Sequence, residues 1–86
     1  MDINQLSEKI KSKILNYKEI KNVEIVDKSY LHKNHKSNEL GKFHIKLIIN
    51  SEELKKKNRI EANKFIFKIL EDELKANIHS LQIFFT

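Results

Sequence analysis

Residues 77–86, which read NIHSLQIFFT, decide the fold of this chain. Leu81, Ile83 and Phe85 alternate with residues of the opposite face, which is typical of a β-strand, and His79 opens the strand in the same phase. A helical segment precedes this strand, so the strand is expected to follow an earlier one through a helical crossover. Such crossovers join parallel strands with right-handed geometry. The stretch therefore predicts a parallel strand pair in an α+β fold.

Two earlier stretches, residues 23–30 and 43–49, show the period-two alternation of half-buried strands. The polar residues 31–42 separate them, a connection that is long for a hairpin and therefore a candidate functional loop. We expect this loop to be mobile because it has little apolar content. The first two strands are expected to pair antiparallel and the last two parallel, which gives the strand order 1-2-3.

A first helix is expected near the start of the chain, where apolar residues recur at helical spacing. Asp2, followed three residues later by Gln5, forms a capping box that predicts where the helix begins. The predicted apolar stripe consists of Ile3, Leu6, Ile10, Ile14 and Tyr17.

The crossover between the second and third strands is expected to hold a short helical turn and a longer helix. Ser51 can cap the turn, and Asn58 with Glu61 forms a second capping box that opens a helix over residues 58–75. Asn77 is expected to end this helix in the left-handed conformation. The expected buried face carries Ala62, Phe65, Ile66, Ile69, Leu70 and Leu74.

These elements predict the order α-β-β-α-α-β, with a three-stranded mixed sheet and helices packed on one face. With 86 residues, the chain is expected to form a single domain over 1–86.

The lack of cysteine excludes a disulfide scaffold and any cysteine-based zinc finger or redox centre. The longest apolar run, residues 47–49, is too short to span a membrane. No secretory signal is recognised, so a cytoplasmic location is expected, with mitochondria or another organelle left open.

Nothing in the sequence is typical of an enzyme. No activated nucleophile is recognised, and the carboxylates Glu71, Asp72 and Glu73 are expected on the outer side of their helix, without a polar pocket. We therefore expect a binding module rather than a catalyst.

Histidines are the candidate ligands. His32, His44 and His79 are expected at one end of the sheet, with His35 in the loop nearby. Each has a simpler interpretation: His79 as a half-buried ring bonded to the backbone, His44 as a side chain facing water opposite its strand's apolar phase, and His35 as a solvated loop residue. No two of them have the spacing of a zinc site, so spacing alone is weak support for a metal.

Four segments resemble BolA-like proteins. Residues 23–32, VEIVDKSYLH, are similar to the family's first-strand pattern V-x-V-x-D-x-S-x-x-H, and residues 43–49, FHIKLII, resemble its second strand. Residues 70–74, LEDEL, and 78–81, IHSL, resemble the family's L-A-E-E-L and V-H-A-L. The resemblance implies a type II KH-like fold with the element order given above.

The resemblance also implies a partner and a cofactor. BolA-like proteins form heterodimers with monothiol glutaredoxins, in which a glutaredoxin cysteine and a glutathione thiol share a [2Fe–2S] cluster with two ligands from the BolA-like side. Here these ligands would be His79 and His32, with His35 as a possible substitute. The implied role is iron–sulfur cluster assembly and trafficking, or iron homeostasis. Alone, the protein is expected to be a monomer without a cluster.

The alternative function is a nucleic-acid-binding transcriptional regulator. The net charge of +5 permits such a partner, or an acidic protein, although a solvated surface is the simpler interpretation. Against it, the aromatic residues are expected mostly at core positions, without a stacking platform. The family's His-Arg pair is replaced by Asn63-Lys64, and a single glycine cannot supply the G-x-x-G loop of KH domains. The candidate basic residues are Lys55, Lys56, Lys57, Arg59, Lys64 and Lys68.

Overall fold

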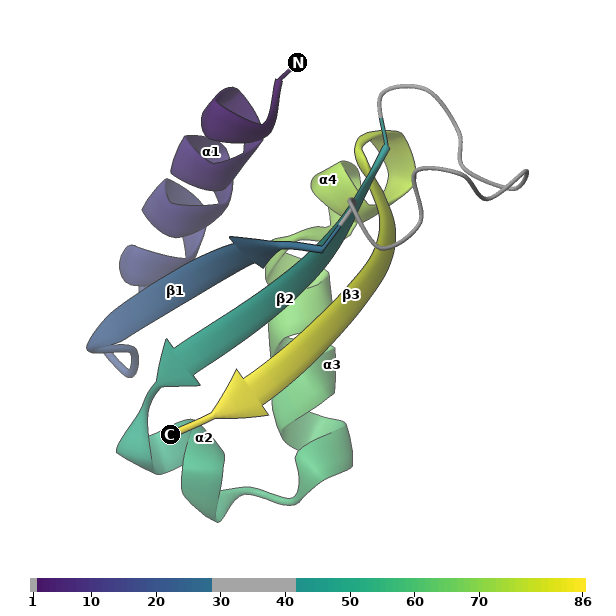
Figure 1. The fold of residues 1–86 in the computed structure, drawn as a ribbon. Coiled ribbons are helices and arrows are strands. Elements are labelled where there is room, and N and C mark those ends of the chain that lie inside the picture. The colour runs from purple at the N-terminus through teal and green to yellow at the C-terminus, as the bar shows by residue number, and fades with distance from the viewer. Residues whose placement is uncertain (1, 29–41) are drawn as a thin grey trace.

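The computed structural model describes residues 2–28 and 42–86. The predicted α+β fold is confirmed in this part of the chain (Figure 1). In chain order, the elements are α1 (Ile3–Leu15), β1 (Asn22–Asp27), β2 (Phe43–Asn50), α2 (Glu52–Lys56), α3 (Arg59–Ile69), α4 (Glu71–Ala76) and β3 (Ile78–Phe85).

The three strands form one mixed sheet in the order β1-β2-β3. β1 pairs with β2 antiparallel, and β2 pairs with β3 parallel across the helical crossover, as the sequence predicts. Figure 1 shows α1, α3 and α4 on the same side of the sheet, behind the strands. The opposite face, which is turned toward the viewer, has no described helix over it. No helix in the described part of the chain has the length and apolar character needed to cross a membrane.

The helix starts follow the local capping chemistry. Asp2 accepts a hydrogen bond from the backbone of Gln5, and the Gln5 side chain accepts one in return, so the capping box is formed. The Ser51 side chain caps α2, and the Asn58 side chain caps α3 by accepting from the Glu61 N–H. These caps satisfy N–H groups that the first helical turn leaves without partners.

The helix predicted over residues 58–75 is interrupted. Leu70 leaves helical geometry, with φ −100° and ψ 19°, and separates α3 from α4. Asn77 has φ −129°, so the left-handed conformation predicted for it is wrong. Its carbonyl accepts a hydrogen bond from the Phe43 N–H, so the chain passes from α4 directly into the sheet without a left-handed residue.

The core lies between the helices and the inner face of the sheet, where the apolar stripes predicted from the sequence meet. The exception is Tyr17, which follows the end of α1 and lies at the surface, edge-on to Phe65 with ring centroids 5.4 Å apart. The buried apolar residues are Leu6, Ile10, Ile14, Ile20, Val23, Ile45, Leu47, Ile49, Leu54, Ala62, Ile66, Leu70, Ile78 and Ile83.

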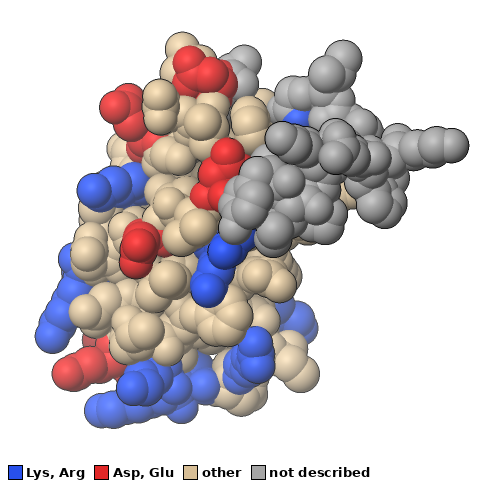
Figure 2. Space-filling model, in the orientation of Figure 1, with Lys and Arg blue, Asp and Glu red and all other residues tan. Residues whose placement is uncertain are grey.

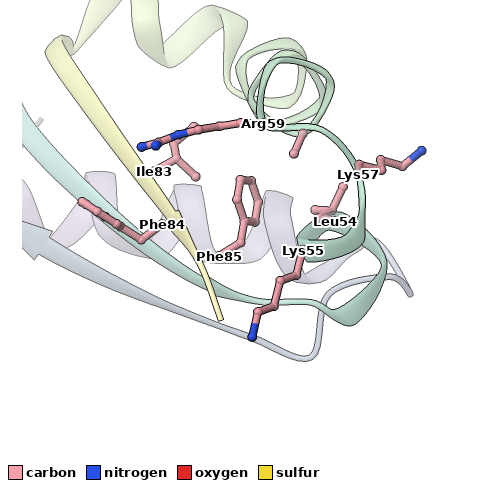
Figure 3. A pocket seen from close by; sticks show the side chains of 8 residues that line it. Leu54, Lys55, Lys57, Arg59, Ile83, Phe84 and Phe85 are labelled. Atoms are coloured by element: carbon pink, nitrogen blue, oxygen red, sulfur yellow. The ribbon is translucent and has the colours of Figure 1, made fainter.

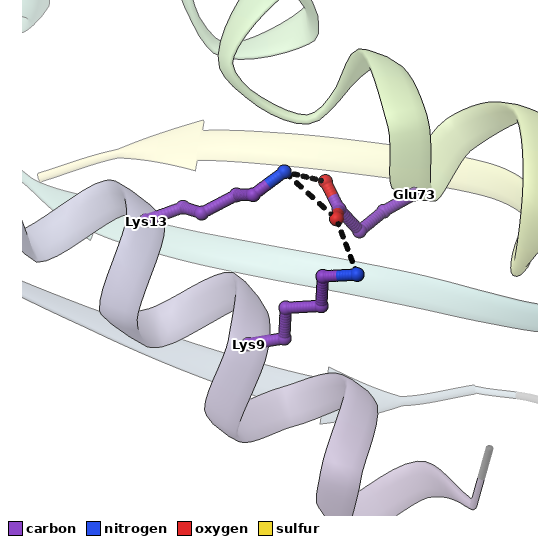
Figure 4. A network of polar contacts seen from close by, with 3 residues as sticks. All are labelled: Lys9, Lys13 and Glu73. Atoms are coloured by element: carbon purple, nitrogen blue, oxygen red, sulfur yellow. Dashed lines mark hydrogen bonds and ion pairs between the residues drawn. The ribbon is translucent and has the colours of Figure 1, made fainter.

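Glu73 is buried inside this helix layer, at 1% exposure, so its predicted place on the outer side of a helix is wrong. Lys13 donates to both carboxylate oxygens at 2.8 Å, and Lys9 lies 3.4 Å from one of them (Figure 4). Both lysines extend from α1, so the network joins α1 to α4. Burial alone would raise the pKa of the Glu73 carboxyl, but the hydrogen bonds and charges of the lysines outweigh it and hold this pKa below its ordinary value of 4.5.

Candidate functional site

The candidate site lies at the edge of the sheet where β1 ends and where β2 and β3 begin. The Lys28 N–H donates to the His44 carbonyl at 2.7 Å, and the Phe43 N–H donates to the Asn77 carbonyl at 2.8 Å. These hydrogen bonds join the three strands at this edge. The topology therefore brings His44 and His79, which are far apart in the sequence, to the same end of the sheet.

A β-bulge separates the first two residues of β3 from the regular ladder. Phe43 pairs with Ile78, but His44 pairs with Ser80, so the register passes over His79. Two residues of β3 thus oppose one residue of β2, and bulges of this kind redirect a side chain. The bulge removes His79 from the phase of Leu81, so the prediction that His79 shares this inward phase is wrong.

His44, His79 and Ser80 form a contact cluster at the bulge. The rings of His44 and His79 have centroids 4.9 Å apart and planes inclined by 34°. His44 Nδ1 and Ser80 Oγ are 2.7 Å apart and share a hydrogen bond. His44 is buried, at 7% exposure, whereas His79 is exposed.

The simpler interpretations of these two histidines are therefore both wrong. His44 does lie opposite the apolar phase of β2, but it is buried rather than facing water, and it contacts the His79 ring and the Ser80 hydroxyl. His79 is not half-buried, because the bulge presents it at the surface of the sheet edge. The structure does not describe residues 29–41, which include His32, His35 and all but the last residue of the loop predicted to be mobile.

The potential metal ligands in this contact cluster are the imidazole nitrogens of His44 and His79, with the Ser80 hydroxyl beside them. Within residues 2–28 and 42–86, no group of three or more His, Cys, Asp or Glu residues is placed to hold a metal ion. A [2Fe–2S] cluster needs four ligands and is held mainly by thiolates. Of the described residues at this site, the exposed His79 would be one ligand of such a cluster, and the other ligands would have to come from elsewhere.

Four of the six candidate basic residues lie around α2, at the far end of the sheet: Lys55, Lys56, Lys57 and Arg59. Figure 2 shows Lys and Arg side chains gathered at the lower end of the view, over α2 and the start of α3. There, Lys55, Lys57 and Arg59 line a hollow of about 290 Å³ between the α2–α3 turn and β3. In Figure 3, Arg59 extends over this hollow toward β3, whereas Lys55 and Lys57 point away from it. We name it the basic groove; its other lining residues are Leu54, Ala62, Ile83, Phe84 and Phe85.

The six candidate basic residues do not form one site. All six are exposed, but Lys68 lines a separate hollow with Phe67 and Leu74, and Lys56 and Lys64 do not line the basic groove. The expectation that the aromatic residues lie mostly in the core is also wrong for Phe67, which is 40% exposed, and for Phe84. The Phe84 ring is 43% exposed beside the groove, with the Lys46 ammonium 4.8 Å from its centroid.

Comparison with known proteins places this geometry in a family. The model of BolA-like proteins matches residues 15–86, which include the histidine cluster and the basic groove. The chain belongs to the BolA-like family. Among solved structures, the BolA domain of SufE1 from Arabidopsis thaliana is similar, with a TM-score of 0.80 and 26% sequence identity over 99% of this chain and 94% of that chain. No curated protein sequence matches this one.

Sequence reasoning did not identify Ser80 or the buried state of His44, although a signal for both was present. Ile78 and Leu81 are both directed to the core side but are three residues apart. A regular strand alternates faces every residue, so it cannot direct both of them inward. This odd spacing in the BolA-like protein requires one extra residue between them, and that residue is His79.

Proposed function

We propose that this BolA-like protein is a non-enzymatic partner of a monothiol glutaredoxin and co-ligates a [2Fe–2S] cluster, in iron–sulfur cluster trafficking or iron homeostasis. The observation that carries the proposal is the exposed His79 at the sheet bulge. Its position lets a second protein bring thiolate ligands to it without disturbing the core.

The ligand chemistry supports a shared site. The second ligand on this side would be His32, which follows Lys28 by four residues in the sequence, or His35. A cluster iron bound by imidazole in place of thiolate has a higher reduction potential, as in Rieske centres. Imidazole ligation also depends on pH, because the ring must be neutral to bind the metal.

Titration with a cluster-loaded monothiol glutaredoxin tests this proposal. We expect the visible circular dichroism of the cluster to change and to saturate when the two proteins are equimolar. The same titration with glutaredoxin lacking its cluster is the control for simple association. A cluster spectrum that stays the same throughout the titration would reject the proposed function.

The isolated protein is expected to bind no cluster. Its sequence has no cysteine, and clusters are held mainly by cysteine thiolates. Anaerobic incubation with iron, sulfide and a reductant, followed by desalting, should therefore leave it colourless. A coloured homodimer formed without any thiol partner would contradict this expectation.

A second candidate function is binding of nucleic acid at the basic groove. The observation that favours it is the combination of cationic side chains with the exposed Phe84 ring, since bases stack on aromatic rings and phosphates pair with cations. The α2–α3 turn has no glycine, so the groove differs from a G-x-x-G loop. We regard this interaction as electrostatic and non-specific.

The triple variant K55Q/K56Q/K57Q should weaken duplex binding evenly across sequences. Between about 50 and 200 mM salt, the binding constant should also depend less steeply on salt. The slope of log K against log salt concentration should be shallower by about 0.9 for each phosphate contact that is lost. The control, K11Q/K18Q/K21Q, removes the same charge from exposed sites that do not line the basic groove. If the first variant lost preference for one sequence and the control did not, a specific regulator would be favoured instead.

A further inference from the structure

We infer that His44 and Ser80 are positioning residues, which hold the His79 ring in one orientation at the bulge before a partner arrives. The inference deepens the proposed function and rests on it where cluster binding is concerned. The orientation of the ring in the free protein can be tested independently.

The register between β2 and β3 determines which residue of β3 pairs with His44. In a regular parallel ladder His79 would pair with His44, but Ser80 takes that place. The ladder therefore pairs no residue of β2 with His79, and the order of its ring depends on side-chain contacts. An exposed side chain of this kind otherwise samples several rotamers on a fast timescale.

Contacts that run from Ser80 through His44 order the His79 ring. Ser80 Oγ lies 2.7 Å from His44 Nδ1, and this hydrogen bond fixes the rotation of a ring that is already buried. The ordered ring of His44 then lies against that of His79, with centroids 4.9 Å apart. Paired aromatic rings at such separations attract each other. Ser80 thus acts on His79 through His44.

An ordered His79 ring lowers the entropic cost of binding the cluster. Immobilising a side chain on binding has an entropic cost, which a preorganised ligand avoids. Loss of the Ser80 hydroxyl should therefore speed cluster loss from the heterodimer about two- to tenfold, the range expected when one side chain must be ordered on binding. Metal ligands are commonly oriented by a second layer of residues in this way.

The experiment compares S80A, H44A and S80T with the control Q82A, an exposed position on the same strand and sheet face. In the free protein, the rotamer distribution and relaxation of the His79 ring are measured by NMR. In the heterodimer, the line shape of the visible circular dichroism and the rate of cluster loss are measured. Thermal unfolding of each variant separates loss of stability from loss of orientation.

We expect S80A and H44A to increase the motion of the His79 ring, to alter the cluster line shape and to speed cluster loss. S80T should restore all three properties, and Q82A should leave them unchanged. Ser80 is exposed, so S80A should unfold near the wild-type temperature even if H44A is destabilised. The inference would be overturned if the His79 ring were as ordered in S80A and in H44A as it is in the wild type. If the wild type never acquires a cluster, the proposed function fails, and the NMR comparison still decides the positioning role.

Discussion

Replacing His79 by alanine is expected to abolish the spectral change on mixing with cluster-loaded monothiol glutaredoxin. The reason is that His79 is the exposed imidazole that the bulge presents at the sheet edge. The variant should remain folded, because substitutions at exposed positions usually change stability by at most about 0.5 kcal/mol. For a domain of this size, that corresponds to a shift of only a few degrees in the unfolding temperature.

Three further variants sharpen this test. H79C provides a thiolate at the same position, so it should retain a cluster with a lower reduction potential than the wild type. H32A should weaken the spectral change, and less completely if His35 substitutes; the double variant H32A/H35A should show the full loss. A stable H79A protein with the wild-type cluster spectrum would remove His79 from the site.

Replacing Lys13 by methionine is expected to lower the unfolding temperature by roughly 5–10 °C. The change removes the two 2.8 Å hydrogen bonds to Glu73 and leaves the buried carboxylate with Lys9, 3.4 Å away, as its basic partner. A buried charge that loses its partner is strongly destabilising, and unfolding temperatures of small domains respond steeply to such losses. E73Q should be milder, because it removes the buried charge itself. Thermal unfolding followed by far-ultraviolet circular dichroism measures both.

The effect of Lys13→Met should depend on pH in a defined direction. The lysine contacts hold the folded-state pKa of Glu73 below its ordinary value of 4.5. The ion pair therefore contributes its full stability above about pH 4.5, and this contribution is lost as the pH falls through the lowered folded-state pKa. The hydrogen bond to Glu73 raises the pKa of Lys13 above 10.5, so the contribution is also lost at strongly alkaline pH. The difference in stability between the wild type and K13M should therefore shrink at low pH and at strongly alkaline pH.

A matched control is available on α4. Glu71 and Lys75 form an exposed i,i+4 pair at 3.6 Å, and exposed pairs of this type contribute little. K75M should therefore change the unfolding temperature by no more than about two degrees at any pH. If K13M and K75M behaved alike, the buried network would not join α1 to α4 energetically.

Much of the fold was predictable because its signals are local. The apolar stripe of α1, the Asp2–Gln5 capping box and the alternation in β2 each depend on residues within a few positions of one another. The parallel pairing of β2 with β3 followed from the helical crossover, since handedness and chain connectivity leave few alternatives. The same reasoning brought His44 and His79 to one edge of the sheet.

Other features depended on contacts between distant segments. The break at Leu70 was not predicted. The conformation of Asn77 was predicted wrongly, because its carbonyl accepts a hydrogen bond from Phe43, which is distant in the sequence. Glu73 appeared to be a surface residue because carboxylates are rarely buried without a partner. Its spacing of seven residues from the buried Ile66 was a signal that it shares the inner face of the helix layer, but the partner, Lys13, lies on another helix.

The sequence by itself determined the element order, the sheet topology and the gathering of histidines at one edge, because periodicity, capping and crossover handedness are properties of short segments. Only the tertiary structure decided which histidine is buried and which is exposed. That outcome depends on the register between β2 and β3, where the inward placement of both Ile78 and Leu81 requires a bulge. The bulge sets Ser80 against His44 and presents His79 at the surface, because one extra residue in a strand reverses the face of every residue that follows it.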